Sequence, residues 1–345
     1  MSFTTDRLQI FIVTYNRARY LRRTLVKLLA ETSPVRNCEI VILDNHSTDE
    51  TRVVAQEFVP RGNVTVITHP RNIGGNANIV RAMELARPNA YVWTLGDDDF
   101  YDFANWAEVE SAMERGEKAI CLARYILPDE QKDDVPRQLV QATFITGMIV
   151  HASLYSDTVV SEAHNAVHTL FPQLVPILSW VNRGGCLFVV SRPVVFNGDD
   201  GREGKDVSYC RGSDVSDVSP YSREQTWLTG WSMVIAGIRD RQLREQAFMA
   251  GASFVSKVTD GADAWWKVNR YLLSRFRVKR LLPMLAAVAA VAPDEISRQL
   301  MPPPFVAQTK ARFKCAFYRV CIWLFPGHCE HFEKSLAKWK SYLWQ

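Results

Sequence analysis

Residues 90–100 read Ala-Tyr-Val-Trp-Thr-Leu-Gly-Asp-Asp-Asp-Phe, the most informative stretch of the chain. Its apolar run predicts a buried strand, and Gly96 marks the point where the chain turns out of the sheet. Three adjacent carboxylates follow, Asp97, Asp98 and Asp99, and they repel one another unless a cation lies between them. Mg²⁺ suits such a place, because it takes one or two carboxylates and completes its shell with phosphate oxygens and water. A solvated acidic turn is the alternative.

Strand and helix alternate along the chain before this triplet. Apolar runs and helical spacing predict strands at 9–13, 39–43, 64–68 and 91–95, and helices at 19–30, 47–58 and 77–86. Residues 47–50 have the form of a capping box that opens the second of these helices. Such alternation predicts an α/β fold with a parallel sheet covered on both faces. The polar residues after each strand should then converge at the carboxyl edge of the sheet, where such folds bind ligands.

Two common phosphate-binding motifs are missing from the sequence. No Gly-x-Gly-x-x-Gly follows the first strand, and no Gly-x-x-x-x-Gly-Lys-Ser/Thr occurs anywhere. Rossmann-type dinucleotide binding and P-loop phosphate binding are therefore disfavoured.

Three other strand ends carry motifs: Ile-Val-Thr-Tyr-Asn-Arg at 12–17, Val-Ile-Leu-Asp-Asn-His-Ser-Thr-Asp at 41–49, and Asn-Ile-Gly-Gly-Asn at 72–76. Together with the acidic triplet they resemble the family 2 glycosyltransferases of the GT-A fold, over roughly residues 7–200. The resemblance implies a three-layer α/β/α sandwich with a C-terminal helical extension. It also implies inverting transfer of a sugar from a nucleotide-diphosphate donor to a hydroxyl group.

The resemblance implies a donor site at these strand ends. Thr14, Tyr15 and Arg17 would line the base and ribose pocket. Asp44 would accept a hydrogen bond from the base, and its alternative role is to cap the following helix. The loop at 72–76 would lie near the ribose and phosphates, or else be a plain tight turn; its donor-binding candidates are Asn72 and Gly74.

The triplet departs from the family's usual Asp-x-Asp-Asp, because Gly96 stands where the first acid is expected. Asp97 or Asp98 would then take the donor-binding role of that first acid near the ribose. Asp98 or Asp99 would hold Mg²⁺ or Mn²⁺, with Asp99 as the first choice. The Gly-Asp-Asp-Asp form resembles a subgroup that includes abequosyl- and other deoxysugar transferases of bacterial O-antigen synthesis.

The general base that takes the acceptor's proton is harder to assign. Many family members supply it from a Glu-Asp pair, and no such pair occurs between residues 150 and 200. We expect His168 or Asp157 to fill this role, with Glu162 and His164 as the other titratable residues nearby. A structural role for His168, beside an apolar run, is the alternative.

The C-terminal quarter differs from the rest in charge. The chain carries a net charge of +4, yet residues 264–345 hold fourteen Lys and Arg against four Asp and Glu, interleaved with tryptophans. We expect a GT-A domain at 1–205, a loop and connecting helices at 206–263, and a basic helical region at 264–345. The polar, glycine-rich stretch at 199–217 is expected to be a lid over the donor, or else a surface linker.

This basic region suggests contact with an anionic membrane, or simple packing on the catalytic domain. The expected acceptor is a glycan or a polyprenyl-linked saccharide, and membrane contact would suit an acceptor anchored on a polyprenyl lipid. No nucleic-acid partner is expected. An odd number of cysteines without Cys-x-x-Cys spacing favours a reducing compartment, so we expect a cytoplasmic protein, peripheral on the inner face of the membrane.

Two rival functions remain at this point. A sugar-nucleotidyltransferase would need a glycine-rich loop after the first strand, which residues 14–17 lack. A non-catalytic nucleotide-sugar-binding or scaffold protein of the same fold is disfavoured by the acidic triplet and favoured by the missing Glu-Asp pair.

Overall fold

The computed structural model describes residues 3–122, 134–196, 198 and 223–258, together with 318, 333–334 and 336–337. Contacts divide the chain into two units, Met1–Phe254 and Val255–Gln345, and the fold given below is that of the first unit. The expected lid at 199–217 lies outside the described residues, as does the basic region at 264–345 apart from five isolated positions.

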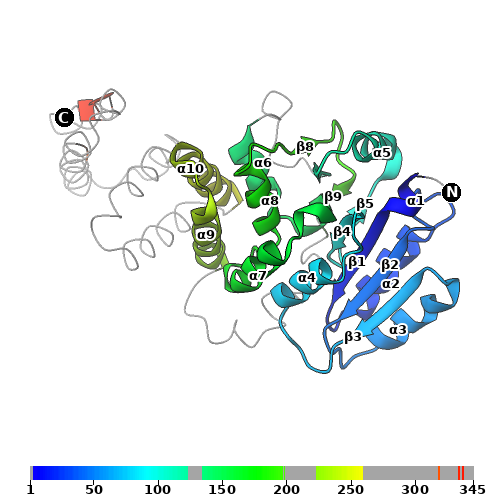
Figure 1. Cartoon of the computed structure of the whole chain (residues 1–345). Helices are drawn as coiled ribbons and strands as arrows, with labels where there is room; N and C mark the ends of the chain where they lie inside the picture. Colours follow the sequence, from blue (N-terminus) through cyan, green and yellow to red (C-terminus); the bar gives the residue numbers. More distant parts are fainter. Residues whose placement is uncertain are drawn as a thin grey trace. The chain divides into compact units, whose positions relative to one another are not determined.

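One sheet dominates the first unit (Figure 1). Within the described ranges seven strands join it in the order β3-β2-β1-β4-β7-β6-β8, and β5 and β9 form a separate pair. Strands β1 to β4 run parallel, whereas β7 runs antiparallel to both β4 and β6. The bounds are β1 Leu8–Thr14, β2 Glu39–Asp44, β3 Val64–Thr68, β4 Tyr91–Leu95, β5 Phe100–Tyr101, β6 Ala119–Cys121, β7 Met148–His151, β8 Phe188–Val189 and β9 Val195–Phe196.

Helices cover both faces of this sheet. The hydrophobic core on one face includes residues of α2, α3 and α5, and the core on the other face includes residues of α4 and α7. The bounds are α1 Phe3–Arg7, α2 Ala18–Leu28, α3 Thr51–Phe58, α4 Gly75–Glu84, α5 Trp106–Glu114, α6 Val135–Gln141, α7 Asp157–Asn165, α8 Leu174–Val181, α9 Arg223–Val234 and α10 Arg241–Val258. The predicted α/β/α sandwich is confirmed.

Strand β1 shows why the sheet is buried on both sides. Successive side chains of a strand point to opposite faces. Ile10 and Ile12 accordingly belong to the core beneath α2 and α3, while Phe11 and Val13 belong to the core beneath α4. A continuous apolar run is therefore needed, as expected for a parallel strand with helices on both faces.

The predicted capping box is wrong. Helix α3 begins at Thr51, three residues later than the box required, and its N-cap residue Glu50 makes no side-chain capping bond. The Ser47 hydroxyl instead accepts a hydrogen bond from the backbone N–H of Asn16, at 2.9 Å. This contact docks the loop after β2 against the loop after β1, so a tertiary interaction replaces the local one.

The parallel strands end together at one edge of the sheet. Thr14 at the end of β1 pairs in register with Asp44 at the end of β2, and Asp44 pairs with Thr68 of β3. The acidic triplet directly follows β4, which lies on the other side of β1. The predicted convergence of polar residues is confirmed. None of the helices in the described ranges is long and apolar enough to cross a membrane.

Candidate active site

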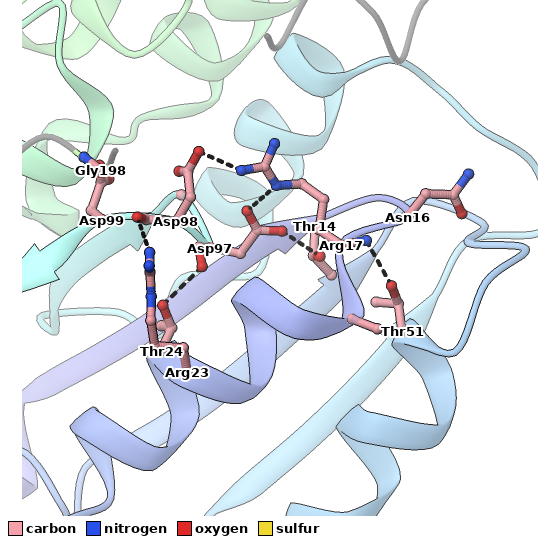
Figure 2. Close-up of polar contacts among 12 residues, drawn as sticks. Thr14, Asn16, Arg17, Arg23, Thr24, Thr51, Asp97, Asp98, Asp99 and Gly198 are labelled. Carbon is pink, nitrogen blue, oxygen red and sulfur yellow. Dashed lines mark hydrogen bonds and ion pairs between the residues drawn. The ribbon is translucent and has the colours of Figure 1, made fainter. Parts of the chain in front are cut away.

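Asp97 lies at the centre of the polar cluster at this edge (Figure 2). It is 3% exposed, and one carboxylate oxygen accepts a hydrogen bond of 2.6 Å from the Thr14 hydroxyl. The other oxygen lies 2.6 Å from Nε of Arg17. The backbone carbonyl of Asp97 accepts a further bond from the Thr24 hydroxyl of α2. Asp97 thus joins the end of β4 to the end of β1 and to the helix that follows it.

Asp98 is the most accessible carboxylate of the triplet. Its side chain is 33% exposed, and it forms an ion pair with Nη2 of Arg17. Its backbone carbonyl accepts a hydrogen bond from Arg23 of α2. The rings of Tyr20 and Phe100 lie beneath these guanidinium groups at cation–π distances, which fixes both arginines beside the triplet.

Asp99 is buried and held by protein groups. It is 5% exposed, and one carboxylate oxygen accepts a hydrogen bond of 2.9 Å from the backbone N–H of Gly198. The buried Thr146 hydroxyl is a second donor to this carboxylate, and it also accepts a bond from the backbone N–H of Gly96. Asp99 therefore ties the triplet to the 3-10 helix η4 (Ile145–Gly147) that precedes β7, and to Gly198 after β9.

Burial raises the pKa values of Asp97 and Asp99. It raises the pKa of Asp97 to about 7, against the lowering effect of the Arg17 guanidinium. It also raises the pKa of Asp99 to about 7, an effect that the neighbouring charge of Asp98 increases and the donors Thr146 and Gly198 oppose. A cation bound beside these carboxylates would lower both pKa values, because it favours the ionised form.

Asp44, the predicted acceptor for a base, is fully buried at the end of β2. One carboxylate oxygen accepts a hydrogen bond of 3.0 Å from the backbone N–H of Ser47, and the other lies 3.1 Å from Nε of Arg52. Helix α3 begins only at Thr51, so Asp44 is not its N-cap. The carboxylate holds the loop after β2 together, and Arg52 covers it.

The loop after β3 is tied to the loop after β2. The side-chain oxygen of Asn72 accepts bonds from Asn45 and from the backbone N–H of Gly74, and Asn45 in turn accepts one from Ile73. Gly74 has a φ of 86°, in the region that favours glycine. Tyr15 is half-buried in the loop after β1. The structure thus brings the predicted donor residues to neighbouring strand ends.

The two candidate general bases, Asp157 and His168, lie near opposite ends of the strands. Asp157 lines a cavity with Pro88 and Asn89, which precede β4, whereas the triplet follows β4. Five residues of strand, roughly 16 Å, separate these two ends. The structure does not bring Asp157 to the triplet.

His168 lies at the other end of this layer, in the 3-10 helix η6 (Val167–Thr169) that follows α7. The carbonyl of Val167 accepts a hydrogen bond of 2.7 Å from Asn76, in the first turn of α4 beside Gly74. His168 is exposed. The geometry therefore favours His168 over Asp157 as the residue near the donor loops.

Four residues of the cluster were not predicted: Arg23, Thr24, Thr146 and Gly198. Arg23 could have been predicted from the sequence, because α2 follows the strand end that carries Arg17. The guanidinium groups of Arg17 and Arg23 both lie over the ring of Tyr20. Thr146 and Gly198 had no local signal, because they reach the triplet only through the pairing of β7 with β4 and of β9 with β5.

Comparisons with known proteins identify the family of this chain. The sequence profile described as "Glycosyl transferase family 2" matches residues 9–204, more than half of the chain. A segment of 94 residues is 27% identical to an uncharacterized glycosyltransferase of Mycoplasma pneumoniae, covering 27% of this chain and 31% of that protein. The chain thus spans about a third of the length of this curated relative.

Among solved structures, the fold is similar to that of residues 1–349 of S. aureus TarS. The complex with UDP-GlcNAc gives a TM-score of 0.55 at 11% identity, over 97% of this chain and 92% of that one. The complex with UDP gives 0.52 at 11% identity, over 97% and 91%. At this identity the likeness shows the fold alone, and it confirms the expected GT-A architecture. With the matching profile, these findings show that the chain belongs to glycosyl transferase family 2.

Proposed function

We propose that this chain transfers a sugar from a nucleoside-diphosphate donor to a hydroxyl group of a glycan or lipid-linked acceptor, with inversion at the anomeric carbon. Membership of glycosyl transferase family 2 supports glycosyl transfer. The observation that carries the proposal is the acidic triplet, joined to the end of β1 through Thr14 and Arg17. A deoxyhexose donor and a role in bacterial surface polysaccharide, either O-antigen or capsule, rest on the sequence resemblance.

The chemistry of the triplet fits a divalent cation. Its side chains offer hard oxygen ligands, and Asp98 is the most exposed of the three. In the described part of the chain no group of three or more His, Cys, Asp and Glu side chains surrounds one point. The protein would therefore supply one or two carboxylates, as Mg²⁺ sites formed with phosphate groups commonly do. We assign Asp98 as the first ligand and Asp99 as the second, because Asp99 is already held by Gly198 and Thr146.

In the reaction the acceptor oxygen attacks the anomeric carbon as the bond from that carbon to the phosphate oxygen breaks. Mg²⁺ or Mn²⁺, when bound, neutralises charge on the leaving diphosphate. Arg17 and Thr14 hold Asp97 so that the triplet keeps one geometry. His168 takes the proton of the acceptor hydroxyl, a role worth about 10²- to 10⁴-fold in rate.

A panel of nucleotide sugars tests this proposal. A donor that binds only the native state raises the melting temperature, so UDP-, CDP-, GDP- and dTDP-sugars are screened for stabilisation with Mn²⁺. The donor that stabilises the chain is then incubated with it, and release of nucleoside diphosphate is measured. We expect slow, metal-dependent release in water and faster release with a glycan acceptor. Stabilisation without any release would support a non-catalytic binding protein, and pyrophosphate formed from a nucleoside triphosphate and a sugar phosphate would support a nucleotidyltransferase.

A further inference from the structure

The end of β2 presents a guanidinium group where a carboxylate was expected. Asp44 is fully buried, and both of its oxygens are engaged, one by the backbone of Ser47 and one by Arg52. The Arg52 side chain is 47% exposed. A ligand that approaches this strand end therefore contacts Arg52 before it can reach Asp44.

Arg52 keeps hydrogen-bond donors beyond this ion pair. Its Nε atom points to Asp44, and Nη2 lies 3.5 Å from Nδ1 of His46. The two terminal nitrogens of a guanidinium carry four N–H groups in a planar fork, which suits a pair of neighbouring acceptors. The ion pair with a buried carboxylate restrains the orientation of this fork.

The position of Arg52 fits the base end of a nucleotide. The triplet follows β4, and Asp44 ends β2, with only β1 between them. Two strand spacings, roughly 10 Å, separate these two ends, a span that a ribose and its base can bridge. Thr14, the register partner of Asp44, donates to Asp97 and so connects the two ends.

We infer that Arg52 selects the base of the donor, and that the preferred base carries two adjacent hydrogen-bond acceptors. Cytosine offers N3 and O2, and guanine offers O6 and N7, the pair that arginine contacts most often in DNA. Uracil and thymine place an N3–H donor between O2 and O4, so the fork meets one acceptor only. Adenine places its amino group between N1 and N7. The ligand class is thus a cytidine or guanosine diphosphate sugar.

This inference rests on the proposed donor site, and free nucleoside diphosphates test it separately from catalysis. Binding of CDP, GDP, UDP, dTDP and ADP is measured by calorimetry with Mg²⁺ present, so that only the base differs. A bidentate pair predicts that CDP or GDP binds roughly 5- to 100-fold more tightly than UDP, dTDP and ADP. Comparing CDP with GDP then decides which of the two acceptor pairs the fork recognises.

Two variants of Arg52 and a matched control complete the test. Arg52→Met removes the fork and frees the carboxylate of Asp44 to accept from uracil N3–H, so the preference should move toward UDP. Arg52→Lys keeps the charge but loses the planar fork, so selectivity should fall while the variant stays folded. The control is Arg22→Met, because Arg22 is equally exposed at 47% and pairs with Glu57 of α3 instead. This control should keep the wild-type order of affinities.

The outcomes separate the inference from the proposed function. Tighter binding of UDP, dTDP or ADP than of CDP and GDP by the wild-type chain overturns the role of Arg52 and leaves the donor site standing. An order of affinities that Arg52→Lys and Arg52→Met both leave unchanged overturns it as well. If none of the five diphosphates binds at millimolar concentration, the donor site itself is refuted.

Discussion

The Nε atom of Arg17 lies 2.6 Å from a carboxylate oxygen of Asp97, and the same guanidinium pairs with Asp98 (Figure 2). Arg17 is the N-cap residue of α2, and its backbone N–H donates to the Thr51 hydroxyl, so its position is fixed from two sides. One arginine thus offsets the repulsion between two adjacent carboxylates at the edge of the sheet.

Removing this arginine should destabilise the fold. Arg17→Met leaves Asp97 buried without its cationic partner, which should lower the free energy of unfolding by about 1–2 kcal/mol at pH 8, where Asp97, with a pKa of about 7, is mostly ionised in the wild-type chain. The loss should shrink as the pH falls, because protonated Asp97 needs no partner. Urea denaturation at pH 6 and pH 8 measures both effects. Arg22→Met, which breaks an exposed ion pair, is the control, and an equal effect of the two substitutions would contradict the role of Arg17.

Gly198 approaches the triplet so closely that no side chain fits. A Cβ atom at this position would lie 2.1 Å from the backbone oxygen of Asp98. Gly198→Ala should therefore displace the triplet by some tenths of an ångström to an ångström, and lower metal-dependent turnover by roughly 10²-fold. Steady-state rates with the stabilising donor check this prediction. Wild-type turnover in Gly198→Ala would show that the segment after β9 does not hold the triplet.

Gly230 of α9 approaches η6 so closely that no side chain fits between them. A Cβ atom there would lie 1.7 Å from the carbonyl oxygen of Thr169, the residue after His168. Gly230→Ala should move η6 and lower kcat more than donor affinity, because His168 lies in η6, whereas the donor loop after β3 contacts η6 through the Asn76–Val167 hydrogen bond alone among those described. The matched control is Gly237→Ala, at the end of the 3-10 helix η7 (Ile235–Gly237), where a Cβ meets no atom within 4 Å. Equal kcat values for the two variants would argue against a role for η6 in catalysis.

His151 should make stability depend on pH. It is 6% exposed at the end of β7, with its ring against Tyr91, and burial together with the charge of Lys118 lowers its pKa to about 4. The unfolded chain binds a proton near the ordinary histidine value and the native state does not, so the contribution of His151 to stability falls as the pH falls from 7 to 5. The raised pKa values of Asp97 and Asp99 act in the opposite direction, so the effect of His151 is the difference between wild type and variant. The loss should be about 1–2 kcal/mol. Denaturant unfolding of wild type and His151→Gln checks this, and an equally steep pH dependence in the variant would refute it.

The core of the fold was readable from the sequence because its pattern is local. Strand β1 needs apolar residues on both faces, and the run from Ile10 to Val13 supplies them without a gap. The four parallel strands therefore appear where the apolar runs predict them. The start of α3 was mispredicted, because Ser47 binds Asn16, a residue 31 positions away.

The candidate site could be predicted from the sequence only in part, because some of its contacts join residues that are far apart in the chain. Thr14, Arg17, Asp44 and the triplet could be predicted as site residues, because each lies just after an apolar run that forms a parallel strand. Thr146 contacts Gly96 across 50 positions of sequence, and Gly198 contacts Asp99 across 99. The pairing of Asp44 with Arg52 likewise depends on where α3 begins. Such contacts follow from sheet topology, which no local pattern encodes.

The most direct test of the proposed activity is donor hydrolysis by Asp98→Asn, a substitution that keeps the shape of the side chain and removes its charge. Release of nucleoside diphosphate is measured for wild type and variant over a range of Mn²⁺ concentrations, with Arg22→Met as the control. We expect Asp98→Asn to lose at least about 10²-fold in turnover, the scale of one lost electrostatic contact to a transition state, and to need more Mn²⁺. Wild-type turnover and an unchanged Mn²⁺ dependence in Asp98→Asn would contradict the assignment of this triplet as the catalytic centre.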